Sequence, residues 1–277
     1  MIKANKTLGQ HFLANKGIIE KIILAAELTQ EDTVLEIGPG LGALTFELSK
    51  RAGKVIAVEK DRELAETLKE KLAEQKIDNV EIITGDILEF LSTRYSQFGP
   101  ELTAEGLLST RYSVVANIPY YLTSHLIRLL LELENKPENI ILMIQKEVAQ
   151  RICAADKKES LLSLSVKFYA EPKILFYVSK GSFLPPPKID SAVIEITPKK
   201  SLAPIEADKF FAVVKAGFSA PKKMLISNLT KKLKMEKATL ENVFTELSID
   251  HKIRAGKLNL DQWSELAYYL SNNEKLS

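Results

Sequence analysis

The chain has 277 residues, 45% of them hydrophobic and 27% charged, with a net charge of +2, so it is long enough for one large domain or for a large and a small one, each with its own core. No apolar run approaches the roughly 20 residues of a membrane span, and the N-terminus carries charges where a signal peptide would be apolar, so we expect a cytoplasmic protein with no membrane partner. A single cysteine excludes an internal disulfide, and the three scattered histidines show no ligand spacing, so we expect no metal site.

The first two thirds of the chain alternate helical and extended patterns. Isoleucines at helical spacing predict a helix within 17–28, and the strand-like run Thr33–Ile37 leads directly into a glycine-rich loop. Further strands are predicted over Lys54–Glu59, Val80–Ile83, Val114–Ala116 and Ile140–Ile144, with helices over 43–51, 64–72 and 126–133 between them. Strands that alternate with helices in this rhythm indicate a parallel sheet with right-handed crossovers.

A change of pattern follows the fifth strand. Two more strands are predicted over Lys173–Val178 and Ala192–Thr197, and because the segment between them lacks helical length, we expect an antiparallel hairpin at one edge of the sheet. Beyond 198–204 only helical periods occur. The predicted fold is therefore α/β, with a Rossmann-like sheet of about seven strands in residues 1–198 and a smaller all-helical domain in residues 199–277.

One segment does not fit this scheme. Residues 91–113 carry the sequence Ser-Thr-Arg-Tyr-Ser twice, at Ser92–Ser96 and again at Ser109–Ser113. Glycine and proline interrupt the stretch between the two copies. We interpret it as a surface loop with a duplicated sequence and assign it no function.

Charge is distributed unevenly along the chain. Residues 199–257 hold 13 Lys and Arg against 6 Asp and Glu, a net charge of +7, which leaves −5 for the remainder. A basic C-terminal segment on a mildly acidic body suits a polyanionic partner that is contacted mainly by one end. The alternative is a solvated helical face.

The loop after the first sheet strand indicates a nucleotide-type cofactor. Gly38, Gly40 and Gly42 allow the backbone to pass close to a ligand, and Glu59, at the end of the next strand, stands where an acid would hold a ribose. With Ala43 the loop also satisfies a dinucleotide fingerprint. Both NAD and S-adenosylmethionine remain open at this point, as does the alternative that each acid is a solvated loop residue.

Two further strand ends help to separate these cofactors. Asp86, after the third strand, can accept the exocyclic N–H of a bound adenine. Asn117-Ile118-Pro119-Tyr120 follows the fourth strand and suits the methylation of an exocyclic amine. An amide oxygen of Asn117 and a backbone carbonyl near Pro119 would accept the N–H groups of the amine, and Tyr120 would stack on its ring. Hydride transfer has no use for such a turn, although the same residues also suit an ordinary strand-ending turn.

At this point the chain resembles the ribosomal RNA adenine dimethylase family, and within it the small-subunit rRNA dimethyladenosine transferases. The resemblance runs almost end to end and rests on a set of motifs: Leu8-Gly9-Gln10-His11-Phe12-Leu13, Glu36-Ile37-Gly38-Pro39-Gly40-Leu41-Gly42-Ala43-Leu44-Thr45, Glu59, Gly85-Asp86, Asn117-Ile118-Pro119-Tyr120, Phe183-Leu184-Pro185-Pro186-Pro187-Lys188 and Ala216-Gly217-Phe218. It implies the Rossmann-like sheet of class I methyltransferases and S-adenosylmethionine as the cofactor.

The resemblance also implies roles for particular residues. His11 and Leu13 would sit against the S-adenosylmethionine, and other members of its site would be Gly38, Gly40, Glu59, Asp86 and Asn117. The target base would be held between two aromatic rings, Tyr120 and Phe183, with Asn117 and Pro119 at its amine. Taken alone, Phe183 would be read as a core anchor of its loop, but the three prolines after it stiffen that loop.

Resistance-type methylases of large-subunit rRNA share the catalytic half, so the C-terminal half has to discriminate. Here Phe210–Ser219 and the basic residues that follow look like the small-subunit enzymes. The chain departs from the family at Ala220 and Pro221, where more polar or basic residues are usual, and in the length of segment 91–113.

We therefore expect an enzyme that transfers methyl groups to N6 of two adjacent adenosines in the 3′-terminal hairpin of small-subunit rRNA, acting as a monomer on 16S rRNA in an immature small ribosomal subunit. A large-subunit rRNA methylase, an NAD-dependent oxidoreductase and a noncatalytic RNA-binding assembly factor are the alternatives.

Overall fold

The computed structural model describes residues 10–92, 111–154, 158–201 and 203–272. The chain forms two compact units: the first takes the residues up to Ala149 together with Glu171–Pro198, and the second takes Gln150–Ala170 together with the residues from Lys199 onward. These units differ from the expected domains in residues 150–170, which group with the C-terminal helices. Leu8, Gly9 and most of segment 91–113 lie outside the described residues, including all but Ser92 of the first repeated sequence and the first two residues of the second.

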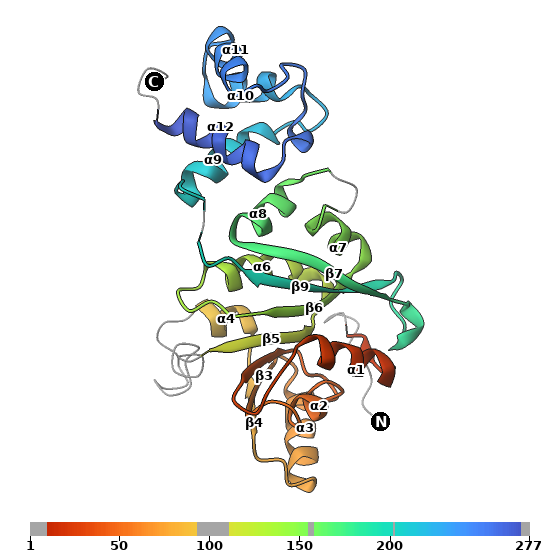
Figure 1. Cartoon of the computed structure of the whole chain (residues 1–277). Coiled ribbons are helices and arrows are strands. Elements are labelled where there is room, and N and C mark those ends of the chain that lie inside the picture. The colour runs from red at the N-terminus through yellow and green to blue at the C-terminus, as the bar shows by residue number, and fades with distance from the viewer. Residues whose placement is uncertain (1–9, 93–110, 155–157, 202, 273–277) are drawn as a thin grey trace. The chain divides into compact units, whose positions relative to one another are not determined.

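A mixed sheet forms the centre of the first unit, with strand order β4-β3-β2-β5-β6-β9-β7 (Figure 1). The pairs β2–β3, β3–β4, β2–β5 and β5–β6 are parallel, whereas β9 runs antiparallel to β6. This confirms the predicted Rossmann-like sheet and its change of direction at one edge. The strands are β2 (Thr33–Ile37), β3 (Lys54–Glu59), β4 (Val80–Thr84), β5 (Tyr112–Asn117), β6 (Ile140–Gln145), β7 (Ala170–Val178) and β9 (Ser191–Pro198).

Two helices of this unit, α1 and α3, begin at residues whose side chains cap them. Asn15 accepts the N–H of Ile18 at the start of α1, and Asp61 accepts two backbone N–H groups at the start of α3. Leu64, Leu68 and Leu72 then face the core from α3, as their spacing predicts. The helices of this unit are α1 (Lys16–Ala25), α2 (Thr45–Leu48), α3 (Arg62–Glu74), α4 (Ile87–Ser92) and α6 (Thr123–Glu132), with 3-10 turns η3 (Tyr120–Leu122) and η4 (Lys180–Ser182); α7 (Lys146–Ile152) follows β6.

Helix α2 is shorter than the predicted 43–51. The backbone carbonyls of the residues that follow Leu48 accept hydrogen bonds from side-chain amides of distant segments. Gln30 Nε2 donates to the carbonyls of Lys50 and Arg51, at 3.1 and 3.2 Å. Asn79 Nδ2 donates to those of Ser49 and Ala52, at 2.8 and 3.0 Å. Such long-range capping cannot be anticipated from local periodicity.

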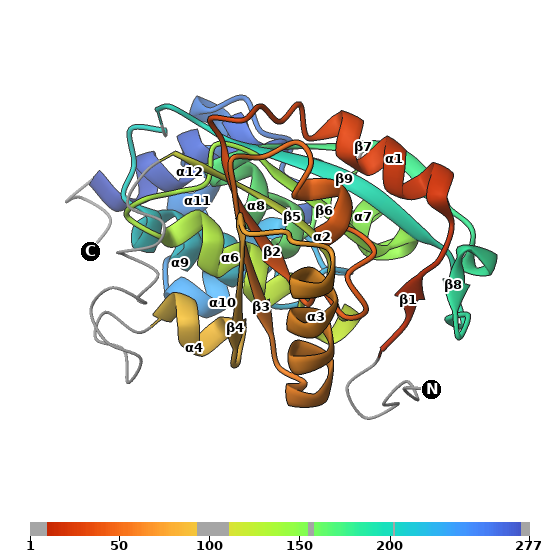
Figure 2. The same ribbon diagram turned by 90° about the horizontal axis from the view of Figure 1, so that it is seen from below.

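A second, two-stranded sheet was not predicted. Strand β1 (Phe12–Leu13) pairs antiparallel with β8 (Phe183–Leu184), and Figure 2 shows the two side by side below α1. The pairing is extended by a hydrogen bond of 2.9 Å from the N–H of Ala14 to the carbonyl of Ser182. Two-residue strands are too short to show a period of two, so only the fold brings these segments together.

The second unit is helical, as predicted: in its described residues after Pro198 there is no strand. Trp263 is completely buried at its centre, where its ring stacks on Phe218 at 5.7 Å between centroids. Gly217 allows this approach, because a Cβ there would collide with the indole. Its helices are α8 (Leu161–Tyr169), α9 (Ala207–Gly217), α10 (Leu225–Leu233), α11 (Lys237–Glu246) and α12 (Leu260–Asn272), with the 3-10 turn η5 (Ala255–Lys257).

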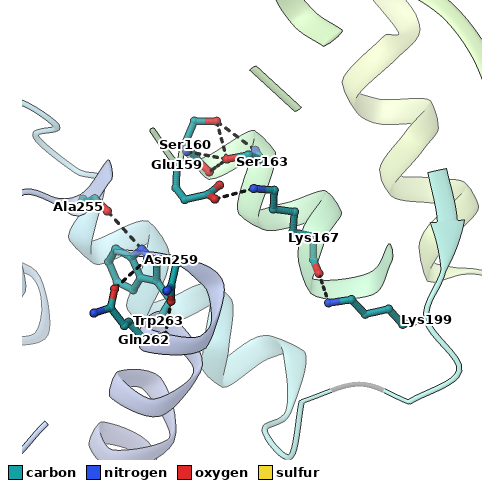
Figure 3. Close-up of polar contacts among 9 residues, drawn as sticks. All are labelled: Glu159, Ser160, Ser163, Lys167, Lys199, Ala255, Asn259, Gln262 and Trp263. Atoms are coloured by element: carbon teal, nitrogen blue, oxygen red, sulfur yellow. Dashed lines mark hydrogen bonds and ion pairs between the residues drawn. The ribbon is translucent and has the colours of Figure 1, made fainter. Parts of the chain in front are cut away.

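Polar contacts attach α8 to the chain that follows Pro198 (Figure 3). Lys167 Nζ lies 2.6 Å from Glu159 Oε1, and the carbonyl of Lys167 accepts a hydrogen bond of 2.7 Å from Lys199 Nζ. Ser160 and Ser163 form a capping box at the start of α8. Phe168 adds apolar contact, since its ring lies 4.5 Å from that of Phe210. The contacts of Lys199 and Phe210 with α8 connect residues 150–170 to the second unit.

Within the described ranges, no helix is long and apolar enough to cross a membrane.

Replacement of Gly53 by alanine tests the turn between α2 and β3. A Cβ at this position would collide with the backbone carbonyl of Gln30, which cannot move without shifting its own turn. We expect Gly53→Ala to lower the free energy of unfolding by about 1–3 kcal/mol, measured by chemical denaturation. Gly181→Ala is the matched control, because the nearest atom to its Cβ is 3.8 Å away. Equal stability of the two variants would contradict the packing described here.

Candidate active site

Four parallel strands end at one edge of the sheet, and the segments that follow β2, β3, β4 and β5 enclose a cavity with the residues around β1. Its volume is about 1070 Å³ including the space at its mouth, at the upper end of small-molecule sites. Nine of the ten predicted site residues line it: His11, Leu13, Gly38, Gly40, Glu59, Asp86, Asn117, Pro119 and Tyr120. The predicted cofactor residues and the predicted amine-binding turn therefore share one cavity.

The glycine loop after β2 forms the floor of this cavity. Gly38, Gly40 and Gly42 all have positive φ, at 67°, 58° and 88°. Side chains with a Cβ are strained in this region of φ, so the loop depends on glycine. Space is limiting as well, since a Cβ on Gly40 would lie 3.1 Å from the ring of Phe12.

Glu59 connects the glycine loop to the end of β3. Its Oε2 accepts the N–H of Gly40 at 3.0 Å, and its Oε1 accepts the N–H of Asp61 at 2.9 Å. Each carboxylate oxygen keeps a further lone pair for a ligand. Burial raises the pKa of Glu59 above its ordinary value, although the backbone N–H groups of Asp61 and Gly40 oppose that shift.

Glu36 is a second buried acid in the wall, and it was not predicted as a site residue. Only 2% of it is exposed, and its Oε2 has no hydrogen-bond partner in the described structure. Burial raises the pKa of Glu36 to about 8, and the nearby charge of Glu59 acts in the same direction. The only signal in the sequence is an acid inside an otherwise apolar strand.

Asp86 lies at the end of β4 with both oxygens engaged. Leu88 N–H donates to Oδ1 and Lys60 Nζ donates to Oδ2, each at 2.8 Å. Burial tends to raise the pKa of Asp86, but the hydrogen bonds and charge of Lys60 and the Leu88 N–H outweigh it, so the pKa lies below the ordinary value. The carboxylate is therefore ionised and oriented. Lys60 was not predicted, because nothing in the sequence indicates its pairing across 26 residues.

Asn117, the last residue of β5, has a defined orientation. Its Nδ2 donates a hydrogen bond of 3.1 Å to the carbonyl of His11. Because a carbonyl oxygen only accepts, the amide nitrogen must face His11, and Oδ1 is turned the other way. Within the described structure, Oδ1 accepts no hydrogen bond. The site thus presents an amide acceptor at the strand end, as the sequence predicts for an amine-binding residue.

Pro119 and Tyr120 complete the turn after β5. The carbonyl of Pro119 accepts the N–H of Leu122 at 3.0 Å, which leaves it one further lone pair. Tyr120 is half-buried and shares a hydrogen bond of 2.8 Å with Ser191, which fixes the position of its hydroxyl. Tyr121 also lines the cavity, but 60% of it is exposed, and no pattern in the sequence distinguishes it from a core tyrosine.

Phe183 corrects the sequence-based expectation. Its side chain is only 2% exposed, lies in the hydrophobic core with Val193 and does not line the cavity. Phe183 pairs with Leu13, which belongs to the same core and also reaches the cavity. In this arrangement Tyr120 lines the cavity without Phe183 opposite it.

Substitution of Glu36 tests its buried ionisation. In the unfolded chain its pKa is 4.5 and in the folded protein about 8, so between these values the folded state keeps a proton that the unfolded state releases. Stability must therefore fall as pH rises from about 4.5 to 8, by at most about 1.4 kcal/mol per pH unit, and level off outside that range. We expect Glu36→Gln to lack this decline, so that its free energy of unfolding relative to the original protein increases from pH 5 to pH 8.

Denaturant unfolding of both proteins at several pH values measures this difference. Glu66→Gln is the control, because Glu66 is exposed on α3. A difference between Glu36→Gln and the original protein that does not change with pH would exclude the raised pKa.

The similarity to known proteins extends over nearly the whole chain, as the motifs do. Residues 1–272 match the sequence profile of the family described as Ribosomal RNA adenine dimethylase. A protein of Dehalococcoides mccartyi (strain CBDB1) named Ribosomal RNA small subunit methyltransferase A is 40% identical over 274 residues, which cover 98% of this chain and 90% of that protein. The protein of the same name from Pelotomaculum thermopropionicum is 41% identical, with 96% and 91% covered.

Two solved structures of rRNA methyltransferases or related enzymes are similar to this chain in both fold and sequence. A dimethyladenosine transferase from Plasmodium falciparum superposes with a TM-score of 0.78 at 27% identity, covering 94% of this chain and 98% of that one. The 23S rRNA methyltransferase ErmE superposes with a TM-score of 0.73 at 25% identity, covering 94% and 100%. The chain belongs to the ribosomal RNA adenine dimethylase family.

Proposed function

We propose that this protein transfers methyl groups from S-adenosylmethionine to N6 of two adjacent adenosines in the 3′-terminal hairpin of small-subunit rRNA, giving N6,N6-dimethyladenosine. The observation that carries the proposal is the orientation of Asn117, whose Oδ1 is turned away from His11 in the wall of the cavity that Tyr120 also lines. This arrangement offers an acceptor for an amine N–H and an aromatic face for the ring that bears the amine.

The cavity suits S-adenosylmethionine by its charge. Its described wall holds three carboxyl groups, Glu36, Glu59 and Asp86, and one lysine, Lys60. Glu36 is protonated below about pH 8, and Lys60 is paired with Asp86. The described wall therefore offers no unpaired lysine or arginine for the pyrophosphate of a dinucleotide, whereas Glu59 and Asp86 suit a ligand that carries a sulfonium and an ammonium group. This is the physical argument against an NAD-dependent oxidoreductase, and a fluorescence titration with each cofactor distinguishes the two.

Individual residues fit parts of the cofactor. The remaining lone pairs of Glu59 suit the two hydroxyls of a ribose, and Gly38 and Gly40 leave room for the ligand to contact the backbone. Asp86 is ionised and suits the amino group of an adenine. When bound, S-adenosylmethionine supplies an electrophilic methyl group.

The residues of the turn after β5 act on the acceptor base. The N6 amine is a poor nucleophile because its lone pair is delocalised into the ring. Asn117 Oδ1 and the free lone pair of the Pro119 carbonyl would accept its N–H groups and favour a tetrahedral nitrogen. Tyr120 would hold the ring by stacking, with its hydroxyl held by Ser191. The rate depends on how the amine is oriented toward the methyl group. No strong base is required, because the nitrogen becomes acidic only after it has gained the methyl group.

The second unit is proposed to dock on the RNA backbone. Most of the basic side chains between Lys199 and Lys257 are exposed. Asn228, which is only 3% exposed, donates to the carbonyls of Gly217 and Ala220 at 2.6 and 3.0 Å and so fixes the turn before α10. Lys222 and Lys223 project from this turn. Ala220 therefore stabilises the turn through its backbone carbonyl, and the neighbouring lysines supply the positive charge for phosphate groups.

The target is proposed to be 16S rRNA within an immature small subunit, bound by a monomer in the cytoplasm. The relatives of about 40% identity that are named small-subunit methyltransferases support this choice over large-subunit rRNA. Similarity to ErmE does not decide it, because that structure covers both halves of the chain as well. A noncatalytic assembly factor would have no need of the oriented Asn117.

Asn117→Ala tests the proposed chemistry. Because one acceptor for the amine is lost, we expect the rate of labelled methyl transfer to immature small subunits to fall by about 10² or more, while much of the cofactor affinity remains. Gln75→Ala is the matched control, since it removes an exposed carboxamide at the end of α3. A rate equal to that of the control would remove Asn117 from this role.

Salt dependence tests the proposed docking. If the lysines of the turn neutralise phosphates, the logarithm of RNA affinity should fall linearly with the logarithm of salt concentration. Replacing Lys222 and Lys223 together by glutamine should reduce the slope by about 2. Lys69→Gln, on α3 of the first unit, should leave it unchanged. A slope that is the same in all three proteins would contradict docking by this turn.

A further inference from the structure

The segment Gln10–Asn15, called here the N-terminal strap, is held by hydrogen bonds to the segment around β8. Phe12 and Leu13 pair with Leu184 and Phe183, and the N–H groups of Ala14 and Asn15 both donate to the carbonyl of Ser182, at 2.9 and 3.3 Å. The strap is thus fastened to the loop between β7 and β9, which is remote in sequence.

The side chain of His11 makes a further attachment. Its Nδ1 lies 2.8 Å from the carbonyl oxygen of Pro185. Since that oxygen only accepts, Nδ1 must carry the proton, and the imidazole acts as a donor at this position. The ring also lies roughly parallel to that of Tyr120, with 6.3 Å between centroids and 29° between planes. Both contacts restrict where the backbone of His11 can lie.

The backbone of the same residue contacts the proposed catalytic amide. The carbonyl of His11 accepts the hydrogen bond from Asn117 Nδ2, at 3.1 Å. The two ends of a carboxamide have nearly the same shape, so packing alone does not decide which end faces the cavity. The carbonyl decides it, because it repels an oxygen and attracts an N–H group.

We propose that His11 is a positioning residue for Asn117: its ring fastens the strap to Pro185, and its carbonyl thereby keeps Asn117 Oδ1 available to the amine of the substrate. This inference rests on the proposed function and adds to it a role for the His11 side chain that differs from contact with the cofactor. The predicted consequence is specific. Without the ring donor, the carbonyl of His11 moves, the carboxamide of Asn117 samples both orientations, and the flipped form presents N–H groups to the N–H groups of the amine.

Three substitutions separate the hydrogen bond from packing. His11→Ala removes the ring, and His11→Leu replaces it by an apolar side chain that cannot donate. His11→Asn keeps an N–H donor on the atom that follows Cγ, where His11 has Nδ1. If the donor is what matters, the asparagine variant should behave like the original protein and the leucine variant like the alanine variant.

The first measurement follows Asn117 itself. The side-chain amide of Asn117 is observed by NMR in ¹⁵N-labelled full-length protein and assigned by its loss in Asn117→Ala. In the original protein and in His11→Asn, we expect its protons to exchange more slowly than those of an exposed amide. In His11→Ala and His11→Leu, the signal should shift toward that of a free carboxamide and exchange faster.

The second measurement is the single-turnover rate of methyl transfer to immature small subunits, at saturating cofactor and RNA so that weakened binding does not contribute. We expect a loss of about 10- to 100-fold in His11→Ala and His11→Leu, and recovery to within about threefold in His11→Asn. Thermal unfolding of each variant checks that it is folded.

Several results would overturn the proposal. One is an Asn117 signal that is unchanged in folded His11→Ala or His11→Leu, and another is a shifted signal without loss of rate. A third is His11→Asn that fails like His11→Ala. If the substituted proteins do not fold, fast exchange of the Asn117 amide in the original protein would overturn it. The NMR result does not depend on the substrate: if the original protein methylates no RNA, the proposed function fails while the role of His11 in orienting Asn117 is still decided.

Discussion

The parallel pairing of β2 with β3 on one side and with β5 on the other is the constraint on which the site depends. In a parallel sheet all carboxyl ends meet at one edge, so the loops that follow these strands have to share one space. The glycine loop, Glu59, Asp86 and Asn117 stand at the carboxyl ends of four different strands, yet they line the same cavity. Their order along the chain therefore has functional meaning only through the topology of the sheet.

Charge and hydrogen bonding then decide what that space can bind. The wall is acidic, and its acids differ in state: burial raises the pKa of Glu36 and Glu59, whereas Lys60 and a backbone N–H lower the pKa of Asp86. The amide of Asn117, by contrast, is neutral and owes its direction to one carbonyl. A cavity of this kind suits a cationic methyl donor at one end and an uncharged amine at the other.

Much of the fold could be predicted from the sequence, because buried parallel strands and amphipathic helices leave strong periods. Strand β3 was predicted with its observed bounds, and the glycine loop, Glu59 and Asn117 were placed at strand ends correctly. Features that depend on contacts between distant segments were not accessible. The pairing of β1 with β8 is one such feature, and the hydrogen bonds from distant amides to the carbonyls that follow α2 are another. Lys60 was missed because its partner is 26 residues away, and Glu36 because an acid within a strand does not by itself indicate a place in the cavity wall.

The oriented amide and the aromatic ring are proposed to serve two adjacent adenosines in one rRNA hairpin. This proposal is tested by mapping methylated positions in small-subunit rRNA from cells that lack this protein. We expect both adenosines of the 3′-terminal hairpin to lose their N6,N6-dimethyl groups and to regain them when the protein is restored, but not when Asn117→Ala is supplied. Persistence of both dimethyladenosines in the cells without the protein would contradict it.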